Sequence, residues 1–245
     1  MKYLNGIWGI ILALLLSACA KENMGDCFKS TGKDRTEKRM LQSFTAIEID
    51  DEINVFLEQS SENSAEVSGG ENLLEFIRTE VKNGILYIEN DNRCNWVRSF
   101  KKDINVIIRA SNLEQITYYG SGDVKCLGTL TPNKFLLNAW NASGDIELDI
   151  NCNDVELKLH TGPISLKCKG SGDRFIAYNS SIGKLDTRKF VASDVLAVNA
   201  NSGDLKVFSD SLLDANIEGN GDLYYSGNPI VKLRVVGSGS LIKLD

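Results

Sequence analysis

Four stretches of the chain share one motif: YGSGDVKC at 119–126, NASGDIEL at 141–148, NSGDLKVF at 201–208 and GNGDLYYS at 219–226. Each copy places a Gly-Asp turn before apolar residues at alternate positions. Such period-two alternation is typical of a strand with one buried face. Glycine allows a tight corner, and aspartate accepts hydrogen bonds from nearby backbone N–H groups. The motif therefore predicts a corner that leads into a β-strand.

The motif belongs to a repeat of 17 to 22 residues that extends over 113–245. Every unit has an alternating apolar stretch, a turn rich in Gly, Asn, Ser and Asp, and a second alternating stretch. A β unit of this length cannot bury its apolar face alone, whereas stacked copies create one continuous core. We therefore expect an all-β, parallel β-helix-like solenoid with one rung per unit. The units open near Leu113, Phe135, Val155, Phe175, Val195, Leu213 and Ile230.

Some turns depart from the motif. Three units turn at TGPI (161–164), SIGKLD (181–186) and GSGS (237–240), and a further GSGD at 170–173 falls between units. A β-sandwich is the alternative fold, because it also has many short strands with regular turns. The solenoid is favoured, since a sandwich gives no reason for one tetrapeptide to recur in register.

Residues 41–112 predict a less regular N-terminal β segment. The stretches FTAIEI (44–49), INVFLEQ (53–59) and INVIIRA (104–110) alternate, and IRTEVK (77–82) and ILYIEN (85–90) flank Asn83-Gly84, a strong hairpin signal. Residues 71–76 offer at most one helical turn. The segment leads directly into the repeats.

The first 18 residues resemble a secretory signal peptide. An apolar run at 6–18 follows Lys2 and ends at Leu16-Ser17-Ala18-Cys19, which resembles the bacterial lipobox. We expect cleavage before Cys19, lipid attachment to it, and stable anchoring, because two or more acyl chains hold a protein on a membrane. The polar residues 19–40 would be a tether. This predicts a bacterial envelope protein, lipid-anchored, at the outer membrane, with the periplasmic or surface face left open.

Composition limits the partners and the cysteine chemistry. A net charge of −6 and a pI near 5.0 argue against nucleic acid as a partner. The remaining cysteines contain no CxxC pair, so no zinc site is predicted. Cys126 and Cys168 alternate with apolar residues and are expected to be buried thiols. A bridge between Cys27 and Cys94 stays open, as does the pairing of Cys152.

Three segments resemble one bacterial family: FTAIEIDDEINVFLEQ, ENLLEFIRTEVKNGILYIEN and INVIIRASNLEQITYYGSGDV. The family is described as putative auto-transporter adhesin, head GIN domain, and the similarity extends over 41–245. The resemblance implies a right-handed parallel β-helix-like fold in an exported or lipid-anchored protein of Bacteroidetes-type bacteria. It implies no activity, and it transfers no catalytic, cofactor or metal residues.

Two groups of side chains are candidates for chemistry. His160 is the single histidine, so a Ser or Cys hydrolase would need it, but its place beside a corner favours a surface side chain. A set of corner aspartates admits three interpretations: turn capping, calcium binding, or a polysaccharide-cleaving pair. Trp96 and Trp140 could stack on sugar rings or simply pack locally. The aspartates are Asp123, Asp145, Asp173, Asp204 and Asp222.

These observations favour a noncatalytic, lipid-anchored envelope or surface module that binds a glycan or a protein. The alternative is a carbohydrate-active β-helix enzyme that uses the corner aspartates. No enzyme activity, cofactor or metal is expected. The strand at 241–245 has no visible cap, so its unpaired edge predicts weak self-association.

Overall fold

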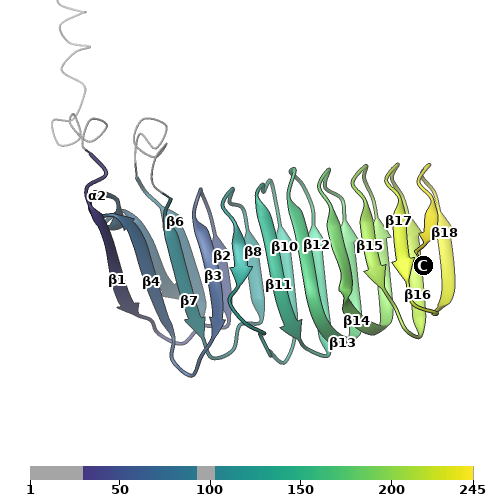
Figure 1. The fold of residues 1–245 in the computed structure, drawn as a ribbon, viewed down its shortest axis with the longest axis horizontal. Coiled ribbons are helices and arrows are strands. Elements are labelled where there is room, and N and C mark those ends of the chain that lie inside the picture. The colour runs from purple at the N-terminus through teal and green to yellow at the C-terminus, as the bar shows by residue number, and fades with distance from the viewer. Residues whose placement is uncertain (1–29, 93–102, 245) are drawn as a thin grey trace, which may run out of the picture.

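The computed structural model describes residues 30–92 and 103–244, which form a rod of stacked β-strands (Figure 1). The described residues contain one short helix, α2 (Glu71–Leu74). Most of the strands form a β-solenoid of about six turns, so the predicted solenoid is confirmed and the sandwich is not. No helix in these two ranges is both long and apolar enough to cross a membrane.

Each rung contributes one strand to each of two opposed faces, which we call face A and face B. Face A holds the strands that precede the glycine-containing corner of each unit: β8 (Gln115–Tyr118), β10 (Phe135–Ala139), β12 (Asp154–Leu159), β16 (Leu212–Ile217) and β18 (Ile230–Val235). Face B holds the strands that follow it: β9 (Val124–Cys126), β11 (Asp145–Asn151), β15 (Leu205–Phe208), β17 (Leu223–Ser226) and β19 (Leu241–Lys243).

Two long strands belong to both faces. β13 (Ser165–Asn179) and β14 (Leu185–Asn199) begin on face B and continue onto face A of the next rung. The GSGD at 170–173 therefore lies inside β13, which corrects the expectation of a turn there. The chain passes this corner in an extended conformation, with Gly170 at φ 127°. A side chain rarely adopts that φ, so glycine is required.

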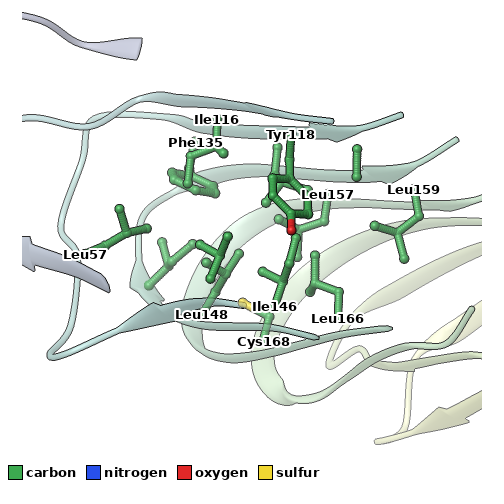
Figure 2. Close-up of a cluster of buried hydrophobic side chains, with 14 of the residues drawn as sticks. Leu57, Ile116, Tyr118, Phe135, Ile146, Leu148, Leu157, Leu159, Leu166 and Cys168 are labelled. Atoms are coloured by element: carbon green, nitrogen blue, oxygen red, sulfur yellow. The ribbon is translucent and has the colours of Figure 1, made fainter. Parts of the chain in front are cut away.

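Parallel pairing in register explains why the repeat specifies the fold. Ile146 pairs with Val124 on one side and with Leu166 on the other, and all three are buried. Equivalent apolar residues thus stack on one another from rung to rung. Figure 2 shows their side chains, from both faces, filling the space between the faces. Each fully buried Leu or Ile contributes about 1.5–3 kcal/mol.

The solenoid begins before residue 113, which corrects the expected domain boundary. β2 (Ala46–Ile49) pairs in parallel with β6 (Ile85–Asn90) and β8, and β3 (Asn54–Gln59) pairs in parallel with β7 (Asn105–Ala110) and β9. The β2–β3 rung therefore lies between two rungs that come later in the chain. Residues 41–112 are part of the same core as the repeats.

The N-terminal end of the rod is covered by strands of opposite direction. β4 (Ser64–Gly70) pairs antiparallel with β7 and with β1 (Asp34–Met40), and β5 (Ile77–Lys82) pairs antiparallel with β6. Asn83 and Gly84 have φ of 52° and 77°, which confirms the predicted hairpin turn. Residues 34–40 were expected in the tether but form the edge strand β1. Its exposed polar side chains give no alternation from which to predict a strand.

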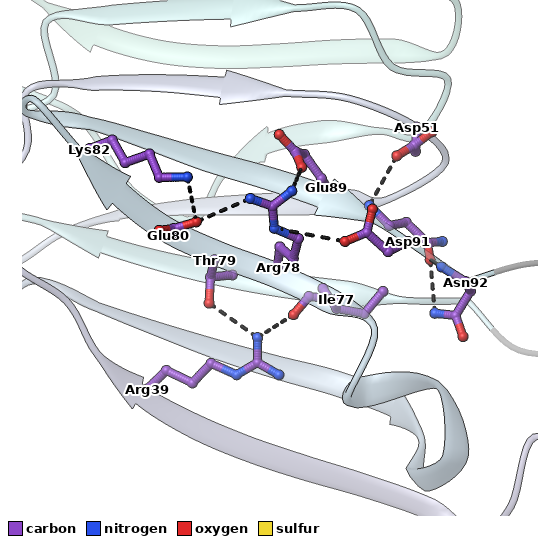
Figure 3. A network of polar contacts seen from close by, with 11 residues as sticks. Arg39, Asp51, Ile77, Arg78, Thr79, Glu80, Lys82, Glu89, Asp91 and Asn92 are labelled. Atoms are coloured by element: carbon purple, nitrogen blue, oxygen red, sulfur yellow. Dashed lines mark hydrogen bonds and ion pairs between the residues drawn. The ribbon is translucent and has the colours of Figure 1, made fainter. Parts of the chain in front are cut away.

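Ion pairs and hydrogen bonds tie these covering strands together (Figure 3). Arg39 of β1 donates to the Thr79 hydroxyl (3.1 Å) and to the Leu74 carbonyl (2.9 Å). Arg78 of β5 contacts Glu80 (3.1 Å) on its own strand and Glu89 (2.5 Å) on β6. The network joins β1, α2, β5 and β6 at this end of the rod. Cys19, Cys27, Cys94 and Trp96 lie outside the described residues.

Candidate functional site

Aromatic residues line one corner of face A. Tyr119, Trp140 and His160 each follow the last residue of a face A strand, in three successive rungs. The backbone N–H of Trp140 donates to the Tyr118 carbonyl (2.9 Å), and the backbone N–H of His160 donates to the Ala139 carbonyl (2.9 Å). These bonds hold the three side chains in register at the rung spacing of about 4.8 Å. The corner therefore carries one ring in each of three successive rungs.

Trp140 and His160 form a close ring stack. Their centroids are 3.6 Å apart and their planes differ by 4°. The imidazole also contacts Tyr178, at 5.5 Å and 45°. Trp140 remains 40% exposed and Tyr119 42% exposed. Because the imidazole of the next rung covers one face of the indole, the opposite face is directed towards the rung of Tyr119.

The surroundings of His160 keep its ring neutral. Burial lowers the pKa of the imidazole, and the nearby Lys158 ammonium lowers it further. Nε2 lies 3.2 Å from Asn138 Oδ1, so a proton on Nε2 would complete a hydrogen bond between them. The ring partners of His160 in the described structure are aromatic or amide groups. The residue supports Trp140 rather than serving a nucleophile.

Carboxylates extend the row at its N-terminal side. Asp50 occupies the position next to Tyr119, because Ile49 pairs with Tyr118 and the Tyr119 N–H donates to the Ile49 carbonyl (2.8 Å). Burial raises the pKa of the Asp50 carboxyl, and Asp51 and Glu89 raise it further. We call Asp50, Tyr119, Trp140 and His160 the corner row. Aromatic rings pack on the apolar side of a sugar, and carboxylates accept hydrogen bonds from its hydroxyls.

The sequence reasoning singled out Trp140 and His160 but missed Tyr119, Tyr178 and Asp50. A signal was present: Tyr119, Trp140 and His160 are separated by 21 and 20 residues, which is the repeat length. An aromatic or imidazole residue directly before the corner in three successive units therefore predicts a stack. Asp50 carries no such signal, because its rung is inserted out of chain order.

The corner aspartates form two stacked pairs, not one ladder. Asp145 occupies the same position as Asp123 in the next rung, and Asp123 Oδ1 accepts the Asp145 backbone N–H at 3.1 Å. Asp222 follows Asp204, and Asp222 Oδ1 accepts the Ser240 N–H at 2.8 Å. Asp173 lies at the opposite corner of its rung, where its backbone N–H donates to the Asn153 carbonyl. The expectation that it belongs to the same set as the other four aspartates was therefore wrong. Two of the five carboxylates, those of Asp123 and Asp222, thus cap the corner of the next rung.

Neither pair is joined by a third potential metal ligand in the described residues. Ser165 and Lys184 occupy the equivalent positions between the two pairs. Lys125 lies 3.2 Å from Asp123 and supplies the positive charge there. Within 30–92 and 103–244, no three His, Cys, Asp or Glu side chains are grouped to hold a metal ion. The geometry favours turn capping over calcium binding.

The three described cysteines are poor nucleophiles. Cys168 and Cys152 are buried and Cys126 is half-buried against the core, and all three are free thiols. Burial raises the pKa of each thiol, that of Cys126 to about 11. Only a thiolate attacks or binds metal efficiently. The prediction of core thiols is confirmed for Cys168, and Cys126 packs at the margin.

The outer side of face B is covered by paired charges. Lys125, Glu147, Lys167, Asp186 and Lys206 occupy the same register position in successive rungs, so their charges alternate. A cleft of about 670 Å³ opens beside them. Two of its cations are neutralised, since Lys169 pairs with Asp149 at 2.9 Å and Arg188 with Asp186 at 2.6 Å. This face presents no strong charge of one sign.

One known protein family matches most of the chain. A family model described as putative auto-transporter adhesin, head GIN domain, matches residues 43–229. The chain belongs to this family. The match includes the N-terminal rungs as well as most of the repeats, in agreement with one continuous solenoid. None of the curated proteins matches this head GIN domain protein.

Solved structures share the fold of this head GIN domain protein. A putative adhesin from Bacteroides fragilis has 22% identity and a TM-score of 0.80, with 86% of this chain and 97% of that chain covered. A putative lipid binding protein from Parabacteroides distasonis has 22% identity and a TM-score of 0.69, with 88% and 98% covered. A putative adhesin from Parabacteroides distasonis has 20% identity and a TM-score of 0.63, with 87% and 98% covered. At such identities the likeness shows the fold alone.

Proposed function

We propose that this protein is a noncatalytic binding module of the bacterial cell envelope, anchored through a lipid on Cys19, that binds a glycan at the corner row. Membership of a family described as adhesins supports the envelope role. The lipobox-like sequence before Cys19 supports the anchor. Since β1 begins at Asp34, the tether would comprise residues 19–33 and would join the rod at its covered end.

The exposed part of Trp140 carries the proposal. Trp140 is 40% exposed although one face of its indole is packed on His160, so part of a rigid aromatic side chain is held open to solvent. Asp50 lies two rungs away, about 10 Å along the rod at the usual strand spacing. A ring and a carboxylate so separated suit an oligosaccharide, whose apolar faces and hydroxyls alternate along its length.

The enzyme alternative receives no support from the corner aspartates. Glycoside cleavage needs one carboxyl group as acid and a second as base or nucleophile, on either side of the scissile bond. Asp123 instead accepts the Asp145 N–H and pairs with Lys125, and Asp173 lies at the other corner. Both features belong to turn geometry. Binding without cleavage is the function that this arrangement favours.

A glycan array tests the ligand. Residues 20–245 retain every described residue and can be produced without the anchor. We expect retention of particular glycans by this protein and at least a tenfold loss in Trp140→Ala, roughly 1.4 kcal/mol. Ile182→Ala is the matched control, since Ile182 is an exposed apolar residue at a corner outside the row. Equal binding by both variants, or binding only to a protein array, would overturn the glycan proposal.

A separate experiment tests the anchor and the exposed side. Metabolic labelling with a radioactive fatty acid should mark the protein and not its Cys19→Ala variant. Protease treatment of intact cells should then remove the protein if it faces outward. An unlabelled wild-type protein would contradict the anchor without affecting the glycan result.

A further inference from the structure

The rung formed by β18 and β19 leaves an apolar surface uncovered at the end of the rod opposite β1 (Figure 1). Four of the ten exposed large apolar side chains in the described residues lie in or next to β18. Leu233 and Val235 pair with the buried Ala215 and Ile217, so they point towards the core. They would be core residues if a further strand stacked on them. The exposed fractions are 74% for Ile230, 52% for Leu233, 49% for Val235 and 65% for Val236.

The two ends of the rod differ in this respect. At the N-terminal end, β1, β4, β5 and α2 cover the first rungs with antiparallel strands and the Arg39 and Arg78 networks. No described element stacks beyond β18. Stacked repeats remain soluble when their end repeats present polar surfaces. The inward row of β18 is apolar, so it calls for a partner.

The backbone of β18 has a free hydrogen-bonding edge. The Ile230 and Val236 N–H groups donate to the Ser211 and Ile217 carbonyls of the preceding rung, both at 2.8 Å. Backbone groups point alternately to the two sides of a strand. The N–H and C=O groups of Val231, Leu233 and Val235 therefore point to the open edge. This edge can pair with one more strand.

We propose that a second copy of this chain packs on this end, with the two β18 strands antiparallel about a two-fold axis at Leu233. A two-fold axis brings the same surface of both copies together and makes the strands antiparallel. In this register Leu233 faces Leu233 of the second copy, and Val231 faces Val235 of the second copy. All three carry the free backbone groups, so the pairs are hydrogen-bonded ones. The apolar rows of both copies become buried.

β18 suits this pairing better than β19. The latter has three residues, and its Lys243 has the inward phase, because it pairs with Tyr225. Lys243 Nζ instead reaches Asn228 Oδ1 at 3.0 Å, near solvent. An inward lysine on an edge strand opposes further pairing. The contact is therefore centred on face A.

Charges on the outer side of β18 make the pairing dependent on salt. In the proposed register Lys232 lies opposite Arg234 of the second copy, twice per dimer. Non-hydrogen-bonded pairs bring side chains close, and like charges directly opposite are destabilising. Salt screens exposed charges. Dimerisation is therefore weak at low ionic strength and stronger at high ionic strength.

Sedimentation equilibrium on residues 20–245 tests the proposal. The protein should be in monomer–dimer equilibrium, and Leu233→Asp should raise the dissociation constant by about tenfold or more. Arg234→Glu should lower it at low salt, because two repulsive pairs become attractive. Ile182→Asp is the control, with an equally exposed apolar residue replaced elsewhere on the rod.

The other outcomes contradict the proposal. A monomer at every concentration and salt level would overturn it, as would equal weakening by Leu233→Asp and Ile182→Asp. Tighter dimers in wild type than in Arg234→Glu at low salt would overturn the antiparallel register. Anionic phospholipid vesicles that bind wild type but not Leu233→Asp, without any dimer, would assign the surface to lipid instead. None of these results depends on the glycan array.

Discussion

Gly203 packs directly under the carbonyl oxygen of Gly183 in the preceding rung: a β-carbon on Gly203 would lie 1.9 Å from that oxygen. The two glycines occupy equivalent corners, so their close approach sets how tightly the rungs can stack. Gly221 meets the Gly203 carbonyl in the same way, at 2.3 Å. The corners of successive turns are therefore in direct backbone contact.

Gly203→Ala should destabilise the protein markedly. The new methyl group must push two backbone segments apart, at a cost of about 2–3 kcal/mol. Gly128→Ala is the control, because no atom lies within 4 Å of the position of its β-carbon. It should be neutral, or stabilising by up to about 1 kcal/mol. Urea unfolding measures both, and equal stabilities would contradict the close stacking.

The single imidazole should titrate below its ordinary pKa of about 6.5. The unfolded chain then takes up the proton at a higher pH than the folded one. The free energy of unfolding therefore falls as the pH is lowered through the range just below 6.5. In Trp140→Ala the imidazole is more solvated, so its pKa should rise. NMR titration of the His160 ring protons measures this, and a midpoint at or above 6.5 in wild type would contradict the buried stack.

Asp123 should act as a cap and not as a calcium ligand. Asp123→Ala removes the acceptor of the Asp145 N–H and should cost about 1 kcal/mol. Asp123→Asn keeps an oxygen acceptor and should lose less. Asp173→Ala alters the same GSGD tetrapeptide at a corner without this bond and serves as the control. Thermal unfolding with calcium or with a chelator should coincide for wild type, and stabilisation by calcium that Asp123→Asn abolishes would establish a metal site.

The buried thiols should resist alkylation in the folded state. With its pKa raised to about 11, about one Cys126 thiol in a thousand is ionised at pH 8. Cys168 is 3% exposed and should react more slowly still. Iodoacetamide treatment followed by peptide mass spectrometry should find both residues unmodified in buffer and modified in urea. Fast labelling of Cys168 in buffer would contradict the closed core.

The repeats were predictable because each rung is a local pattern. Alternation specifies which side chains point inward, and the recurring Gly-Asp corner specifies where the chain changes face. The same tetrapeptide nevertheless has two outcomes: GSGD forms a turn between two strands at 120–123, whereas at 170–173 it forms a corner within the continuous strand β13. The glycines at both places lie against backbone carbonyls of the neighbouring rung, so the tetrapeptide by itself does not distinguish the two outcomes.

The corner row was only partly predictable for the same reason. Trp140 and His160 were candidates from residue type alone, but their stacking requires the pairing of Ala139 with Leu159. The separation of Asp173 from the other aspartates likewise follows from which face of the rung it occupies. Residue spacing indicates such contacts only where rungs follow one another in chain order.

By itself, the sequence determined an all-β solenoid with a continuous apolar core, because inward side chains recur with a period that backbone stacking can satisfy. The tertiary structure alone decided that β2 and β3 enter between later rungs and that the polar residues 34–40 become edge strand β1. Strand pairing is made by backbone N–H and C=O groups, which every residue possesses. A strand that buries few side chains therefore leaves no mark in the sequence.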